Sequence, residues 1–118
     1  MFADINIPLV PFVSAGVNQS LTTGVEVHQG FINAYNSVAR DVLDTVQSEL
    51  VQFDSYSLVA VGDSLGGSLA SIAGISLKAN FASTPLRMFT FGQARTGNTG
   101  YASLAENLVG VENIFRGE

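Results

Sequence analysis

The sequence contains no cysteine and no tryptophan, and only one histidine and one lysine among its 118 residues. Without cysteine, disulfide bonds and thiolate metal sites are excluded. The single histidine, His28, cannot by itself supply a histidine-rich metal site. We therefore expect this chain to use neither a metal ion nor another cofactor.

Basic residues are scarce as a class. Lys78 and four scattered arginines stand against ten acidic residues, which gives a net charge of −5. Without a basic cluster to neutralise phosphates, we expect no nucleic-acid binding. The apolar stretches fall far short of the ~20 residues that a membrane-spanning helix needs. Residues 1–4 lack the basic start and the long apolar run of a signal peptide, so we expect none here.

Hydrophobic residues, in contrast, are abundant. They make up 47% of the sequence, against 13% charged residues, and the mean hydropathy is +0.32. Such a composition excludes intrinsic disorder, and the length fits one small domain. A free-standing domain normally carries about 25% charged residues. The shortage indicates either a part of a larger core or a protein that contacts lipid or a partner.

Strand-like and helix-like segments alternate along the chain. Residues 5–13 are apolar but carry two prolines, which is typical of an edge strand or an extended lead-in. An apolar stripe from 31 to 53 predicts one helix. Further strands are expected at 25–28, 56–61 (a central buried strand), 86–91 and 111–115, and further helices from about 67 to 81 and at 98–109. This order predicts an α/β fold with a mostly parallel sheet and crossover helices.

The strongest local motif is Gly62-Asp63-Ser64-Leu65-Gly66, a G-x-S-x-G between a strand and a helix. In a nucleophile elbow this pattern holds the serine on a tight, strained turn, so residues two before and two after must lack bulk. The helix N-terminus would direct the Leu65 N–H at a developing oxyanion. A glycine-rich turn without chemistry remains the alternative, because the motif alone is weak.

Two other short patterns occur in the sequence. Residues 92–99 follow a strand, precede a helix and nearly match the phosphate-binding G-x-x-x-x-G-K-[ST], but Asn98 replaces the lysine, so we expect no nucleotide binding. Asn18-Gln19-Ser20 is a formal glycosylation acceptor if the protein is secreted. The sequence leaves open that this second match is accidental.

Three ordered segments together resemble one family. They are Val27-His28-Gln29-Gly30-Phe31, then Gly62-Asp63-Ser64-Leu65-Gly66-Gly67-Ser68-Leu69-Ala70, then Phe89-Thr90-Phe91-Gly92-Gln93-Ala94-Arg95-Thr96-Gly97-Asn98. In order and spacing they are similar to the fungal class 3 lipases, which include triacylglycerol lipases and feruloyl esterases, over about residues 25–117. The resemblance implies an α/β-hydrolase fold, cleavage of carboxylic esters by a Ser-Asp-His triad, often at lipid interfaces, and secretion.

The resemblance carries over to individual residues. Ser64 matches the family's nucleophile, and Leu65 matches the residue whose backbone N–H forms half of the oxyanion hole. His28 matches a family histidine outside the triad, so we expect a packed or hydrogen-bonded structural histidine near the site. Asp63 stands where the family usually has histidine, and its carboxylate is expected to raise the cost of building negative charge beside Ser64.

The triad aspartate and histidine have no counterpart in these 118 residues, because in the family both follow the segment that Ile114-Phe115-Arg116 resembles. We therefore expect residues 1–118 to form an incomplete lipase-like domain. With Ser64 but without its partners, the chain alone would retain only about 10³–10⁴-fold catalysis over water.

Two hypotheses about function follow. In the first, the chain derives from a serine carboxylic-ester hydrolase acting on acylglycerols or related esters, with the base and acid supplied from outside these residues. In the second, it is a truncated, non-catalytic remnant or pseudoenzyme that binds lipid or a protein partner.

Overall fold

A computed structural model describes residues 8–117 and contains two small sheets. In the first, β1 (Leu9–Pro11) pairs antiparallel with β2 (Glu26–His28). In the second, β3 (Leu58–Asp63), β4 (Leu86–Phe91) and β5 (Ile114–Gly117) are parallel, in the order β3-β4-β5. The predicted α/β class with a mostly parallel sheet is confirmed.

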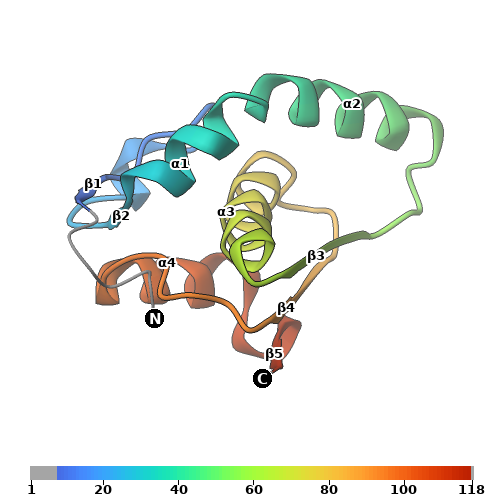
Figure 1. The fold of residues 1–118 in the computed structure, drawn as a ribbon. Helices are drawn as coiled ribbons and strands as arrows, with labels where there is room; N and C mark the ends of the chain where they lie inside the picture. Colours follow the sequence, from blue (N-terminus) through green and yellow to red (C-terminus); the bar gives the residue numbers. More distant parts are fainter. Residues whose placement is uncertain (1–7, 118) are drawn as a thin grey trace.

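Within residues 8–117, four helices accompany this parallel sheet. They are α1 (Gln29–Asn36), α2 (Ala39–Gln52), α3 (Leu65–Asn80) and α4 (Thr99–Val109), and two short 3-10 turns are η2 (Gln19–Leu21) and η3 (Val111–Asn113). Helix α3 lies in the middle, with the parallel sheet on one side and α1 and α2 on the other (Figure 1). Helix α3 connects β3 to β4, and α4 connects β4 to β5.

Small side chains let α3 approach the sheet closely. A Cβ atom added at Gly74 would lie 2.6 Å from Met88 Cε and 3.8 Å from Ala60 Cβ. Ile72 and Ile75, one turn apart in the same helix, have no exposed surface. Helix α3 is thus buried nearly all round, which is why its sequence is apolar without a clear polar stripe.

The prediction of one helix over residues 31–53 was wrong, because the chain breaks at Ser37 and Val38. The Ser37 hydroxyl donates to the carbonyl oxygen of Ala34 at 2.7 Å, and the backbone at Val38 leaves the helical region with φ −121° and ψ 0°. Serine competes with the helix for backbone hydrogen bonds in this way. The apolar spacing continues across the break, which is why the sequence pattern conceals it.

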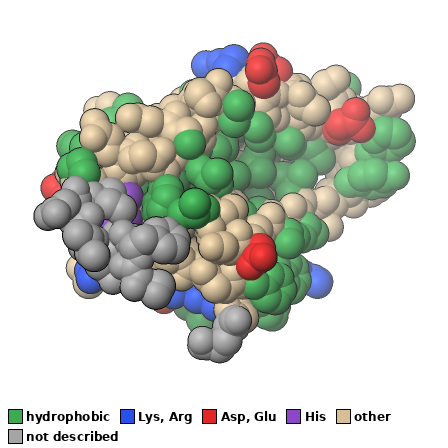
Figure 2. Space-filling model, viewed as in Figure 1, with side chains coloured by type: hydrophobic (Ala, Val, Ile, Leu, Met, Phe, Trp, Pro, Cys, Tyr) green, Lys and Arg blue, Asp and Glu red, His purple; other side chains and the backbone are tan. Residues whose placement is uncertain are grey.

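The prediction that β3 is a central buried strand was also wrong for the part of the chain that the structure describes. Strand β3 is an edge of its sheet, and Val59 and Val61 are 57% and 61% exposed. Side chains alternate between the two faces of a strand, so these exposed residues mark one face of the sheet, and α3 covers only the other. The exposed face, which we call the open sheet face, carries the apolar side chains of Val59, Val61, Phe89, Phe91 and Phe115, with the charged Asp63 and Arg87 beside them. Figure 2 shows hydrophobic side chains gathered at the surface along β3 and near β5.

The two ends of the chain agree with the predictions only in part. Of the expected lead-in at 5–13, residues 5–7 lie outside the described residues, and β1 is the extended segment that remains. The strand expected at 111–115 begins as η3 and becomes β5 only at Ile114. None of the helices within residues 8–117 has the length and apolar character required to cross a membrane.

Candidate active site

Ser64 occupies the turn between β3 and α3 in an unusual backbone conformation. Its φ is 58° and its ψ is −123°, and it is the only non-glycine residue with a positive φ between residues 8 and 117. Such a conformation costs on the order of 1–3 kcal/mol. The Ser64 N–H donates to the Phe91 carbonyl oxygen at 2.7 Å, which holds the turn at the carboxyl ends of β3 and β4. The Ser64 side chain is exposed there.

The two glycines of the motif are not equivalent. A Cβ atom at Gly62 would lie 2.0 Å from the backbone oxygen of Gly66, so only glycine fits at the first position. A Cβ atom at Gly66 would meet no described atom within 4 Å. The expectation that both positions must lack bulk was therefore wrong for Gly66 within residues 8–117. What crowds the turn is the Gly66 backbone, which approaches Gly62, and not the Gly66 side-chain position.

The first turn of α3 presents an unpaired donor beside Ser64. Gly67 and Ser68 both donate their N–H groups to the Ser64 carbonyl oxygen, at 2.9 and 3.4 Å. The N–H of Leu65 has no backbone acceptor among the described residues, as expected for the first residue of a helix. The N-terminus of a 16-residue helix carries a partial positive charge at this point. The arrangement can stabilise an anion next to Ser64.

Asp63 points away from this helix terminus. Alternation along β3 places Ala60 and Gly62 toward α3 and places Asp63 on the opposite face, beside Phe91 of the neighbouring strand. The Asp63 side chain is exposed. A carboxylate surrounded by water interacts much more weakly with a nearby charge than a buried carboxylate does. The structure therefore argues for a small effect of Asp63 on charge developing at Ser64.

A buried hydrogen-bond network ties the loop after β4 to the first turns of α3. Gln93 Nε2 donates to Thr96 Oγ1 at 2.8 Å, and Thr96 Oγ1 donates to Ser68 Oγ at 3.0 Å. Ser68 and Thr96 are both buried. The loop thus supports the helix that carries the elbow.

Asn98 closes the same loop, and its side-chain amide makes structural hydrogen bonds on both its oxygen and its nitrogen. Its Oδ1 accepts from the N–H groups of Tyr101 and Glu26, at 2.9 and 3.1 Å, and its Nδ2 donates to the Gly24 carbonyl oxygen at 3.0 Å. Asn98 therefore caps α4 and fastens it to β2. This is a structural use of the Asn98 side chain.

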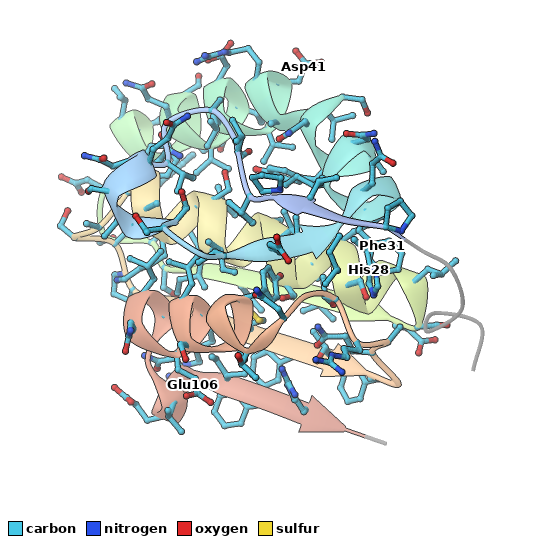
Figure 3. All side chains as sticks on the ribbon, turned by 90° about the vertical axis from the view of Figure 1, so that its left-hand side faces the viewer. His28, Phe31, Asp41 and Glu106 are labelled. Carbon is cyan, nitrogen blue, oxygen red and sulfur yellow. The ribbon has the colours of Figure 1, made fainter. Side chains whose placement is uncertain are left out.

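His28 ends β2 on the other side of this loop. Its backbone N–H donates to the Thr96 carbonyl oxygen at 2.9 Å, and its ring packs edge-on against Phe31 with centroids 5.6 Å apart (Figure 3). Only 7% of the residue is exposed, and Nδ1 is buried without a hydrogen-bond partner among residues 8–117. The contacts are those of a packed side chain. Its structural role stays a prediction.

A cavity of about 550 Å³ lies beside the elbow, and Ser64 is not among its lining residues. It opens between the loop after β4, the start of α4 and the end of β5, and Arg95 and Arg116 line it together with Thr90 and Tyr101. Burial raises the pKa of Tyr101 well above its usual value, although Ser71 and Arg116 act in the opposite direction. The sequence contains no signal for this cavity, because its lining comes from two separate segments, residues 90–102 and 116–117.

Thr90 stands out in the cavity lining, because its hydroxyl is buried and has no hydrogen-bond partner among the described residues. No group of three or more His, Cys, Asp or Glu side chains able to hold a metal ion occurs within residues 8–117.

Comparisons with known proteins agree with the geometry. A family model described as "Lipase (class 3)" matches residues 1–116. The match begins well before the first of the three motifs at residue 27. A secreted mono- and diacylglycerol lipase of Gibberella zeae is 34% identical over 86 residues, which are 73% of this chain and 21% of that protein. A lipase of Rhizomucor miehei is 32% identical over 84 residues, 69% of this chain and 23% of its own length.

A solved structure gives the same result at the level of the fold. The triacylglycerol lipase of Penicillium expansum superposes with a TM-score of 0.86 at 28% identity, covering 98% of this chain and 44% of that one. The chain therefore spans about a fifth of the length of the curated relatives and less than half of this solved relative.

Proposed function

The chain belongs to the class 3 lipase family, and from this premise we propose that it is the part of a serine ester hydrolase that carries the nucleophile. The substrates would be acylglycerols or related carboxylic esters. One observation carries the proposal: an exposed serine at φ 58° on a strand-to-helix turn, next to a helix N–H that has no backbone acceptor within residues 8–117. A turn that only changed direction would not need a strained serine, because glycine is unstrained at positive φ.

The proposed reaction is acyl transfer to Ser64. Its Oγ attacks the ester carbonyl carbon while a base accepts the hydroxyl proton, and the Leu65 N–H helps to stabilise the resulting oxyanion. Collapse of the tetrahedral intermediate expels the alcohol, which receives the proton. Water then repeats the sequence and releases the carboxylic acid. The turn places Ser64 beside the donor before substrate arrives, which lowers the entropic part of the barrier.

We further propose that residues 1–118 form an incomplete domain, and that the triad aspartate and histidine come from sequence outside them. Two observations support this. The chain matches 44% of the Penicillium expansum lipase. In addition, the open sheet face exposes a contiguous apolar surface, as expected where a further layer of the fold would pack. His28 is a poor substitute for the triad base, because its ring is buried against Phe31.

Substrate class and site of action follow from the relatives. The name of the Gibberella zeae relative describes secretion and action on mono- and diacylglycerols. We propose the same general setting here, with an ester substrate at or near a lipid interface outside the cell. Acyl-chain preference is a property of the surrounding cleft, which these residues do not complete.

Hydrolysis of a short p-nitrophenyl ester tests the proposal. The 118-residue chain should hydrolyse it only weakly, within about 10³–10⁴-fold of the rate in water. A longer product of the same gene that supplies Asp and His should be active, and Ser64→Ala should reduce its kcat by about 10⁴-fold or more. Ser83→Ala is a matched control, because Ser83 is exposed and lies in the turn after α3. Activity that survives Ser64→Ala would refute the assignment.

The open sheet face also favours the second hypothesis, a non-catalytic remnant that binds lipid or another chain through it. A folded, monomeric 118-residue chain that is inert with and without Ser64 would support the remnant. Substantial turnover by the wild-type chain, lost in Ser64→Ala, would refute it. Aggregation of the purified chain would instead indicate a fragment that needs the rest of its domain.

A further inference from the structure

The Asn18-Gln19-Ser20 sequon is a feature of the chain that ester hydrolysis does not use. Of the eight asparagines in the sequence, Asn18 alone is followed two positions later by serine or threonine, and the residue between is not proline. Enzymatic N-glycosylation needs this pattern, and it needs the asparagine to be on the surface. The pattern occurs often by chance, so the argument depends on where the structure places these three residues.

All three residues of the sequon are exposed, in the loop between β1 and β2. Asn18 precedes η2, and its Oδ1 accepts from the Ser20 N–H at 2.9 Å. The side-chain nitrogen Nδ2, which is the atom that would be modified, has no hydrogen-bond partner among residues 8–117. The Ser20 hydroxyl likewise makes no hydrogen bond with a described residue. The turn is thus stabilised by a hydrogen bond to Asn18 Oδ1, while Nδ2, the atom that would be modified, stays accessible at the surface.

The loop lies at the end of the molecule remote from Ser64. Asn80, the last residue of α3, donates from Nδ2 to the Ala15 carbonyl oxygen at 3.2 Å, so the loop packs against the C-terminal end of that helix. Ser64 stands at the N-terminal end. A helix of 16 residues spans about 24 Å at about 1.5 Å per residue. A bulky, hydrated group on Asn18 would therefore project away from the elbow.

We propose that Asn18 is an N-glycosylation site. The donor would be an oligosaccharide linked to a polyprenyl pyrophosphate in the secretory pathway. A bond forms between Asn18 Nδ2 and C1 of the first sugar, the C1–O bond to pyrophosphate breaks, Nδ2 loses one proton, and the polyprenyl pyrophosphate leaves. The proposal rests on the secretion included in the proposed function. Its expected effect is on solubility, because it adds a polar group to a chain with few charges.

Expression in yeast behind a cleavable secretion leader tests the site, with the protein analysed in the medium and in the cell extract. Wild type and Ser20→Thr should carry a glycan that peptide N-glycosidase removes, converting Asn18 to Asp. Ser20→Ala and Asn18→Gln should lack it. Ser20→Ala is the matched control, because it leaves Asn18 and its turn in place and removes only a hydroxyl without a partner.

The readout is mass, so it is independent of catalysis. A wild-type chain that enters the secretory pathway without a glycan would overturn the proposal, and so would a glycan that persists in Ser20→Ala. Residues 1–118 alone are expected to be nearly inactive, so activity is read on the longer product that supplies the triad Asp and His. A glycosylated but inactive longer product would count against the proposed function and leave the site standing. An active longer product without a glycan would support the proposed function and overturn the glycosylation site.

Discussion

The difference between the two motif glycines predicts opposite effects of one chemical change. Gly62→Ala places a methyl group 2.0 Å from the backbone oxygen of Gly66, whereas Gly66→Ala places the same group where no described atom lies within 4 Å. Neither glycine has a positive φ, so backbone strain does not separate the two variants. Only the space around the new methyl group does.

The magnitudes follow from what can move. The atom that Gly62→Ala would strike is backbone in the first turn of α3, and that turn is held by the hydrogen bond from Gly67 N–H to the Ser64 carbonyl oxygen. Overpacking of this kind costs about 1–3 kcal/mol, and a rigid neighbour places the effect at the upper end. Gly66→Ala should stabilise α3 by up to about 1 kcal/mol, because alanine is the better helix former. We therefore expect the two variants to differ by about 3 kcal/mol.

Urea unfolding monitored by circular dichroism measures this difference. With an m-value of about 2 kcal/mol per molar urea, the two unfolding midpoints should differ by more than about 1 M. The wild-type midpoint should lie between them, and the m-values should agree if the denatured state is unchanged. Equal destabilisation by both variants would refute the reasoning, because it would show that the second glycine is sterically required as well. A neutral Gly62→Ala would refute it from the other side.

Three further predictions use the same unfolding assay. Ser64→Gly should be more stable than Ser64→Ala by about 1 kcal/mol, because glycine relieves the positive φ; equal stabilities would contradict the strain. Thr90→Val should be neutral or stabilising by about 1 kcal/mol, because it removes a buried hydroxyl that has no partner among the described residues; clear destabilisation would show that the hydroxyl is satisfied. Burial raises the pKa of both Tyr35 and Tyr101 above 10, so both must stay neutral in the folded chain. The contribution of the two neutral tyrosines to the free energy of unfolding is fully present below pH 10 and is lost as the pH rises above it. Tyr35→Phe should therefore weaken the loss of stability above pH 10. An unchanged pH dependence of stability in that range would contradict the raised pKa of Tyr35.

Most of the fold could be predicted from local sequence because its signals are local. The strand at Leu86–Phe91 depends on a short apolar run, and the turn at Ser64 depends on one glycine with a direct steric function, Gly62. The break at Ser37 could not be predicted, because the apolar spacing runs straight through it and one side-chain hydrogen bond decides the outcome. The Asn98 cap was equally hidden, since its partners Glu26 and Gly24 are more than 70 residues away.

The difference between the covered and the open face of the sheet explains the apolar composition of the chain. Helix α3 buries one face of the β3-β4-β5 sheet, and this face together with α3 forms a core of ordinary kind. The other face presents Val59 and Val61 on an edge strand and Phe89 stacked on Phe115, with ring centroids 4.8 Å apart. Exposure of a stacked aromatic pair and neighbouring aliphatic side chains to water is unfavourable, and a further layer of the fold would remove this exposure. An uncovered apolar edge strand also promotes association between chains. Part of the apolar excess of the sequence is therefore found on this sheet face, which includes strand β3, whose last residue, Asp63, directly precedes Ser64. A layer that covered this surface would also fix the strand from which the nucleophile projects, so completing the fold and completing the site would be one step.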